Sequence, residues 1–472
     1  MGCAGHPVVR TPNLDALAAR GAYFTNAYTP SPMCVPTRAA IATGDHVHKI
    51  RHWDSASPYD GEIRSWMRHL RDEGVEVVSI GKLHFRSSDD DNGFSEEILP
   101  MHVVGGIGWP VGLLRETLPA YDTAELAADV GSGTSTYTEY DREITGATED
   151  WLYAKAGSQD PWAAFVSLVS PHYPLTCPDD FFAMYDPTQM DLPVGYANRE
   201  QPEHSELKNV AKFFDYGRYF DEAKMREAKA AYYGLTSFMD ACVGQILKAL
   251  DASGQAENTV VVYISDHGDM MGDQGFWTKQ VMYEQSAGVP MILAGPGVPK
   301  GRHVTTGASL LDLAATALDV TGVEHDDQSS ALPGVSLREL ANAKDDPDRT
   351  ILSEYHDGGS TTATFMLRWQ NWKYVHYVGH VPQLFDLETD PDEMRNLATL
   401  RPNHPDTIAA LAEGEDRLRK ICDPDAVNAQ CFADQKARIA ELGGEEACLN
   451  AYVFNHTPTP TEQAKMGEDE SR

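Results

Sequence analysis

Apolar runs of strand length alternate with helical stretches along the chain, and this alternation is the feature that most limits the fold. Four such runs cover residues 75–80, 162–169, 259–264 and 289–293. Each is largely apolar at successive positions rather than at every second one, which is typical of strands buried on both faces. The sequence therefore predicts an α/β fold with a mixed, mostly parallel sheet that is flanked by helices.

The character of the sequence changes after about residue 345. Residues 349–354, 364–369 and 372–377 are short, aromatic and rich in strand-forming residues, which predicts a small antiparallel sheet. We therefore predict a main α/β domain at 1–345, a small β subdomain at 346–422 and a helical, then extended, tail at 423–472. We expect this tail to pack on another subunit of a homo-oligomer.

Composition excludes several classes of protein. The chain has 472 residues, with 38 Lys or Arg against 71 Asp or Glu, so its formal net charge is −33. A chain this acidic lacks the general electrostatic footprint for nucleic acid or anionic lipid. No run approaches the roughly 18 apolar residues that span a bilayer. The first residues also lack a signal-peptide core, so we expect a cytoplasmic protein. The seven cysteines are odd in number and scattered, and predict neither a disulfide framework nor a zinc site.

Polar residues with catalytic chemistry follow three of the predicted strands. Lys82 and His84 come after the first strand, His172 after the second, and Asp266 and His267 after the third. In open α/β sheets, ligands bind in the crevice outside the carboxyl ends of the strands. The sequence therefore predicts an active site at this edge of the sheet.

The sharpest motif is Cys34-Val35-Pro36-Thr37-Arg38. Alone, it would fit a buried structural cysteine as well as a nucleophile. It stands, however, among TPNLD at 11–15, GKLH at 81–84, SPH at 170–172, SDHG at 265–268, GFWTK at 275–279 and LFDL at 384–387. In this order the chain resembles the sulfatase family of the alkaline phosphatase-like superfamily. GKLHF at 81–85 is most similar to the branch that holds choline sulfatases and phosphonate monoester hydrolases.

The resemblance implies hydrolysis of sulfate monoesters by a modified residue. In this family the cysteine of the motif, here Cys34, is oxidised to formylglycine by a separate formylglycine-generating enzyme. The aldehyde hydrate then attacks sulfur. The resemblance implies that Arg38 holds this hydrate and that Lys82 and Lys279 bind the sulfate oxygens, where fixed cations stabilise the transition state.

The resemblance also assigns the acid–base and metal-binding residues. His172 matches the acid that protonates the leaving oxygen, and His84 matches the residue that bonds the hydrate and helps to release sulfate. Asp266, His267 and the position-34 oxygen match ligands of one divalent metal. Ca²⁺ is implied first, with Mn²⁺ or Mg²⁺ as alternatives.

One departure from the family concerns this metal. Family members begin with a strand that ends in an acidic pair, Asp-Asp or Asp-Gln, and this pair supplies the remaining ligands. Here residues 1–7 match the segment that normally comes after that strand, and Asp15 lies too far on, inside a predicted helix. We therefore expect the first central strand to be missing and the sheet to be open. The intact motifs favour a recorded start that is too late over a degraded relative.

Two other functions remain open from the residues. The first is a phosphonate monoester or phosphodiester hydrolase with the same machinery, because phosphoryl and sulfuryl transfer share an in-line geometry. The second is an inactive, metal-poor binding protein, which the missing acidic pair favours. An aromatic box for the quaternary ammonium of choline sulfate would need Trp53, Trp277, Trp369, Trp372 and Tyr374 together, although core packing explains them more simply.

Overall fold

The central sheet is divided into two parts. The computed structural model describes residues 1–121, 123–196, 204–324, 331–451 and 456–470. One part has the strand order β10-β1-β9-β8 and the other β4-β3-β6. Their bounds are β1 Ala22–Phe24, β3 Glu76–Lys82, β4 Glu96–Met101, β6 Trp162–Ser167, β8 Val261–Ile264, β9 Met291–Ala294 and β10 Arg302–Val304.

The direction of the strands makes the sheet mixed. β3 is parallel to both β4 and β6, and β1 is parallel to β10. β9 is antiparallel to both of its neighbours, β1 and β8. The prediction of a mixed α/β sheet is confirmed, but the apolar run at 289–293 did not reveal that its strand is reversed.

β6 and β8 form the inner edges of the two parts. Within the described residues, neither strand pairs with another strand on its inner side. Their side chains are mostly apolar, yet all of β8 and residues 162–166 of β6 are only half-buried. The neighbouring strand β9 is fully buried, as is β3 apart from its first residue. The two parts of the sheet therefore end at edge strands whose apolar side chains are only half-buried.

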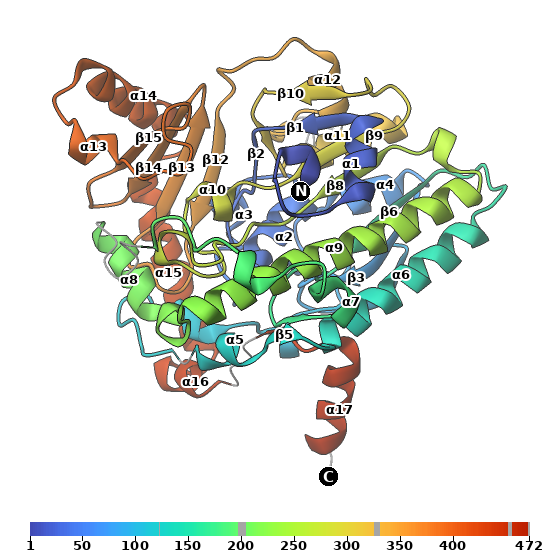
Figure 1. Ribbon diagram of the computed structural model, residues 1–472, viewed down its shortest axis with the longest axis horizontal. Coiled ribbons are helices and arrows are strands. Elements are labelled where there is room, and N and C mark those ends of the chain that lie inside the picture. Colours follow the sequence, from blue (N-terminus) through green and yellow to red (C-terminus); the bar gives the residue numbers. More distant parts are fainter. Residues whose placement is uncertain (122, 197–203, 325–330, 452–455, 471–472) are drawn as a thin grey trace.

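Helices cover both faces of this sheet (Figure 1). Val78 and Ile80 of β3 pack on one face against the helices of the first group, whereas Val77 packs on the opposite face against the second group. The first group is α1 Pro12–Ala19, α6 Thr136–Ala154 and α9 Glu222–Ala252. The second is α2 Cys34–Thr43, α4 Trp66–Asp72, α11 Asp312–Thr321 and α12 Leu337–Asn342. The domain is thus a three-layer α/β/α structure.

A small antiparallel sheet follows the main domain, as predicted. Its order is β12-β13-β14-β15, with bounds β12 Ile351–Tyr355, β13 Thr364–Trp369, β14 Trp372–Tyr377 and β15 Gln383–Asp386. Helix α14, Pro405–Ile421, covers it through Ala410 and Leu418, which are buried in the same apolar cluster as Phe365 of β13.

Short elements complete the described chain. The remaining short helices are α3 Val47–Ile50, α5 Ala124–Ala128, α7 Asp179–Phe182, α8 Ser205–Phe213, α10 Glu284–Ala287 and α13 Leu397–Leu400. Two further strand pairs join β2 Ala27–Tyr28 to β11 Ala308–Ser309, and β5 Val130–Ser132 to β7 Leu175–Cys177. None of the described helices combines the length and the apolar character needed to cross a membrane.

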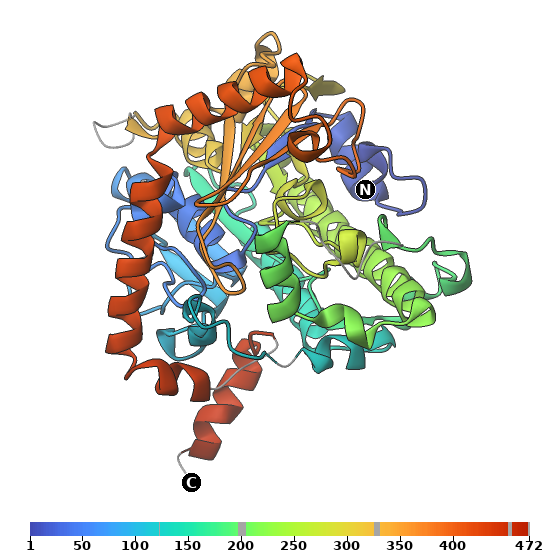
Figure 2. The same cartoon turned by 90° about the vertical axis from the view of Figure 1, so that its left-hand side faces the viewer.

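The tail packs largely on its own chain. It contains α15 Pro424–Glu441, α16 Glu445–Asn450 and α17 Pro460–Glu470. Figure 2 shows α15 running along the main domain and α17 projecting from it. Trp53 Nε1 donates to Asp434 of α15 at 2.9 Å, and Tyr137 Oη donates to the Thr457 carbonyl at 2.7 Å. The homo-oligomer stays a prediction.

Candidate active site

The predicted site residues lie together at the carboxyl ends of the strands. Cys34 begins α2, Lys82 ends β3, His172 follows β6, and Asp266 and His267 follow β8. Contacts within this group join segments as much as 245 residues apart in the sequence.

Cys34 lies at the centre of this group and is 5% exposed. Its Sγ is 3.0 Å from His267 Nε2, and Lys279 Nζ donates to it at 3.5 Å. Burial would raise the pKa of the Cys34 thiol, but the charges of Lys279, His267 and Lys82 hold that pKa well below its usual value. Residue 34 is therefore in surroundings that stabilise a negative charge.

Asp266 and His267 present one oxygen and one nitrogen towards residue 34. The Nδ1 of His267 donates to the Gly268 carbonyl at 2.8 Å, which orients the ring so that Nε2 faces Cys34 Sγ. Asp266 Oδ1 lies 3.8 Å from that Nε2. Burial would raise the pKa of Asp266, but His267 and Arg38 lower it below its usual value. Asp266 is therefore a carboxylate.

Arg38 contacts three segments that meet at the site. Its Nε donates to Asp266 Oδ2 at 2.9 Å, and its Nη1 donates to the Lys82 carbonyl at 2.8 Å and to Ser167 Oγ at 3.1 Å. The guanidinium thus bridges the end of β8 to the ends of β3 and β6, across the opening in the sheet. These contacts hold the guanidinium in place, and its role towards the hydrate of residue 34 stays a prediction.

Lys279 lies in a strained segment. Thr278 and Gln280 on either side have φ values of 63° and 84°, in the left-handed region that β-branched residues such as threonine avoid. Such conformations cost about 1–3 kcal/mol each and persist where the surroundings impose them. The Gln280 Oε1 accepts from Thr278 Oγ1 at 2.9 Å and from the Lys279 amide at 3.0 Å. Sequence reasoning missed Gln280, although it directly follows Lys279.

His172 is held by the backbone and by Lys279. Its Nδ1 is 2.7 Å from the Tyr173 carbonyl, and its Nε2 accepts from Lys279 Nζ at 3.1 Å. The Tyr173 ring lies 4.3 Å from the imidazole. Burial, together with the charges of Lys279 and Lys82, holds the pKa of His172 well below its usual value. Without substrate, His172 is therefore neutral.

Asp141 positions the loop that carries His172. It is fully buried in α6 and accepts from the backbone amides of Val169 and Ser170 at 2.6 and 2.8 Å. These bonds fix the chain two residues before His172. Sequence reasoning missed Asp141, because an acidic residue in an amphipathic helix carries no signal that it is buried.

Lys82 and His84 form the opposite side of the site. Gly81 has φ 103°, and a Cβ there would lie 2.4 Å from the Ser167 carbonyl oxygen, so only glycine allows this approach of β3 to β6. Lys82 is 2% exposed, and burial lowers its pKa to about 8. Burial and the charge of Lys82 lower the pKa of His84 to about 3.

The imidazole of His84 points to a ligand. It is buried, and within the described part of the chain neither ring nitrogen has a hydrogen-bond partner. Buried polar atoms are nearly always paired, so an unpaired pair of nitrogens suits a group that binds there. Its φ of 56° is a further sign of a conformation imposed by the site.

The site is positively charged, although the chain as a whole is strongly negative. Three buried cations, Arg38, Lys82 and Lys279, converge here in a protein whose net charge is −33. Fixed cations in a water-poor site attract an anion and stabilise charge that develops on it. The arrangement therefore suits an anionic ester.

Raising the pH above about 8 is expected to reduce kcat/KM, because deprotonation of Lys82 in the free enzyme removes one of these cations. On the alkaline side of the pH–rate profile, kcat/KM should fall about tenfold per pH unit above that pKa. In Lys82→Arg the limb near pH 8 should disappear, since a guanidinium keeps its proton. A pH–rate profile for both proteins checks this, and an unchanged limb in Lys82→Arg would assign it to another group.

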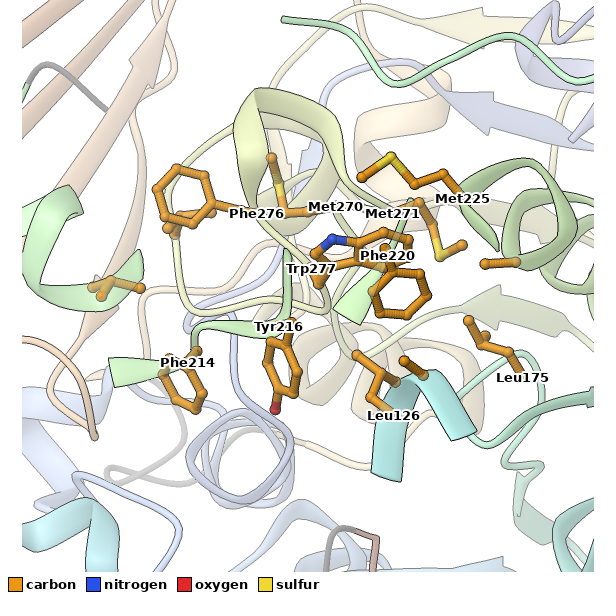
Figure 3. Close-up of a cluster of buried hydrophobic side chains, with 14 of the residues drawn as sticks. Leu126, Leu175, Phe214, Tyr216, Phe220, Met225, Met270, Met271, Phe276 and Trp277 are labelled. Carbon is orange, nitrogen blue, oxygen red and sulfur yellow. The ribbon is translucent and has the colours of Figure 1, made fainter. Parts of the chain in front are cut away.

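The aromatic residues considered for a choline box do not gather. Trp53, Trp277 and Trp369 are each buried in a different apolar cluster, and Trp372 and Tyr374 belong with Trp369. Trp277 stacks on Phe220 with a centroid distance of 3.7 Å (Figure 3). These five residues therefore serve packing.

Comparisons with known proteins agree with this site. A family model described as Sulfatase matches residues 1–323, and one described as N-sulphoglucosamine sulphohydrolase, C-terminal, matches residues 272–420. The choline-sulfatase of Rhizobium meliloti (strain 1021) is 32% identical over 465 residues, covering 95% of this chain and 89% of its own. Arylsulfatase K of Danio rerio is 30% identical over 455 residues, covering 93% and 84%.

Solved structures show the same fold. The phosphonate monoester hydrolase of Silicibacter pomeroyi superposes with a TM-score of 0.71 at 24% identity, covering 88% of this chain and 92% of its own. A protein solved with its substrate D-glucosamine-2-N,6-O-disulfate gives a TM-score of 0.70 at 20% identity, covering 90% and 96%. The fold and the matches define a sulfuric ester hydrolase. This chain belongs to the sulfatase family and hydrolyses sulfate esters.

Proposed function

We propose that this sulfatase cleaves sulfate monoesters with a formylglycine at position 34 as its nucleophile and with one divalent metal. The observation that carries the proposal is the position of Cys34 Sγ, 3.0 Å from His267 Nε2 and 3.5 Å from Lys279 Nζ. Residue 34 thus lies between a metal-binding pair and a cation that contacts His172.

The hydrate of a formylglycine at position 34 would supply one hydroxyl that loses its proton and attacks sulfur in line as the bond to the alcohol oxygen breaks. The second hydroxyl would lose its proton as the bond to sulfate breaks and the aldehyde reforms. Lys82 and Lys279 stabilise the charge on the sulfate oxygens. His84 is assigned to accept the proton of the second hydroxyl. Burial and the charge of Lys82 hold its pKa at about 3 in the free protein, and an anionic ester that opposes this charge raises that pKa and the basicity of the ring.

His172 is assigned as the acid for the leaving oxygen. In the free protein the charges of Lys279 and Lys82 help to keep it neutral. A bound sulfate ester opposes both charges, which raises the pKa of His172 and favours a proton on Nε2. That proton is then available to the alcohol oxygen as the S–O bond breaks.

Asp266, His267 and residue 34 are the residues that would hold the metal. Their donor atoms all lie within 4.8 Å of one another, and the Nδ1 contact to the Gly268 carbonyl orients His267 as in known metal sites. A divalent ion lowers the pKa of the hydrate and polarises the sulfate oxygens. Ca²⁺ prefers about 6–8 oxygen ligands, so this set fits it only in part. A strand between β6 and β8 that ends in acidic residues would complete the shell.

A panel of esters tests the proposed reaction on protein co-expressed with a formylglycine-generating enzyme. We expect 4-nitrophenyl sulfate and choline sulfate to be hydrolysed faster than a phosphonate monoester or a phosphodiester. The reason is that the relatives at 30% identity or above carry the names choline-sulfatase and arylsulfatase.

Each substrate is also run with Cys34→Ala, which should be inactive on all four. Faster turnover of the phosphonate or the diester would identify the protein as a phosphonate monoester or phosphodiester hydrolase with the same machinery. No turnover of any ester by fully converted protein would indicate an inactive relative.

A further inference from the structure

We propose that Cys34, while it is still a cysteine, forms with His267 and Asp266 a binding site for Zn²⁺ or a similar thiolate-binding transition metal. This site exists only in the unconverted chain, because conversion removes the sulfur. It therefore does not depend on the proposed formylglycine chemistry.

The separations of the donor atoms suit a tetrahedral ion. Bonds of about 2.0–2.3 Å at tetrahedral angles place ligand atoms about 3.3–3.6 Å apart. The Sγ of Cys34 is 3.0 Å from His267 Nε2, and that nitrogen is 3.8 Å from Asp266 Oδ1. These two distances lie on either side of the ideal range, and all three donor atoms lie within 4.8 Å of one another, so small side-chain shifts bring them round one ion.

The orientation of the ligands is already set. His267 donates its Nδ1 proton to the Gly268 carbonyl at 2.8 Å, so Nε2, which faces Cys34 Sγ, is the nitrogen that a metal would bind. Arg38 bonds Asp266 Oδ2 at 2.9 Å, and Oδ1 accepts one hydrogen bond, from the His267 amide at 3.2 Å, which leaves a lone pair of Oδ1 for a metal. Such partners of the ligand side chains are what bound metals have in known sites, where their removal costs about 10–100-fold in affinity.

The donor chemistry favours a soft or borderline metal over Ca²⁺. A thiolate, an imidazole and a carboxylate are ligands of Zn²⁺, and three protein ligands with one open position is the pattern of catalytic zinc sites. Coordination displaces the Lys279 hydrogen bond to Sγ and releases any proton on the thiol. Lys279 Nζ, now 3.5 Å from Sγ, then favours an anion such as hydroxide as the fourth ligand.

This site could not be predicted from the spacing of the cysteines in the sequence. Its ligands come from the start of α2 and from the end of β8, more than two hundred residues apart in the sequence. Zinc motifs read from a sequence need ligands at short, regular spacings. Only the meeting of a helix start and a strand end brings one cysteine, one histidine and one aspartate together.

The test uses the full chain expressed without a converting enzyme, with an unmodified Cys34 verified by peptide mass. Co²⁺ is titrated in as a spectroscopic probe. We expect a thiolate-to-cobalt charge-transfer band that saturates at one equivalent and is lost when Zn²⁺ is added. X-ray absorption of the zinc form should show one sulfur at about 2.3 Å.

Matched variants assign the band to this site. Cys34→Ser should lose the charge-transfer band, whereas Cys3→Ser and Cys422→Ser, which change half-buried cysteines elsewhere, should keep it. Asp266→Asn should weaken Co²⁺ binding while circular dichroism stays unchanged. A band that survives Cys34→Ser, the absence of a band in the unmodified chain, or a zinc shell without sulfur would each overturn the proposal.

Discussion

Replacing His172 by alanine is expected to lower kcat by about 10²–10⁴-fold for an alkyl sulfate, the usual contribution of a positioned general acid. An aryl sulfate such as 4-nitrophenyl sulfate should lose far less. The reason is that a phenolate leaves with little protonation, whereas an alkoxide needs a proton as the S–O bond breaks. The measurement is kcat for both esters with the same two proteins.

His303→Ala provides the matched control, because His303 is exposed on β10 and its ring contacts Tyr23 rather than the site. This variant should hydrolyse both esters at the normal rate. If His172→Ala loses the same factor on aryl and alkyl esters, His172 is not the acid, and its contact with Lys279 serves another purpose.

Lys279→Met is expected to reduce kcat/KM by about 10²–10³-fold, the range measured when one transition-state donor is removed. Methionine keeps the volume of the side chain but removes the ammonium. Because that ammonium is assigned to the sulfate oxygens, the loss should be similar for aryl and alkyl esters. This uniform loss distinguishes Lys279 from His172, whose removal selects between leaving groups.

Lys300→Met is the control for charge alone, since Lys300 is exposed at the surface. It should change kcat/KM little. A loss confined to alkyl esters in Lys279→Met would mean that Lys279 acts only through His172 Nε2, 3.1 Å away. A loss below tenfold on both esters would remove Lys279 from the sulfate-binding group.

Much of the fold could be predicted because apolar patterns report burial. Apolar residues recur at helical spacing over residues 222–250, which predicts a long helix. The structure has α9, Glu222–Ala252, at this place, with Asp221 capping its first turn through a bond from the Lys224 amide. The small antiparallel sheet could be predicted because its segments are short, aromatic and rich in strand-forming residues. The direction of β9 was not, since an apolar run has the same composition whichever way the strand runs.

The site was only partly visible in the sequence. Residues at strand ends, such as Lys82 and Asp266, could be expected at one edge because parallel strands end there together. Contacts that depend on the tertiary path could not be expected. The bond between Arg38 and Asp266 joins residues 228 apart. Asp141 and Gln280 act on the backbone around His172 and Lys279, so no motif includes them.

The opening between β6 and β8 lies beside the residues that are proposed to hold the metal. The apolar but half-buried strands there leave the sheet in two parts. Arg38 bridges the two strand ends across this opening. The residues of the site are thus held together across the two parts of the sheet by side-chain contacts.

Comparison of conversion with activity tests most directly whether residue 34 must be a formylglycine for turnover. Preparations co-expressed with different amounts of a formylglycine-generating enzyme are analysed by peptide mass spectrometry for the fraction of converted residue 34. The same samples are assayed for release of sulfate from 4-nitrophenyl sulfate. We predict turnover per chain that is proportional to the converted fraction and zero at zero conversion. Turnover that is equal in unconverted and converted protein would contradict the account.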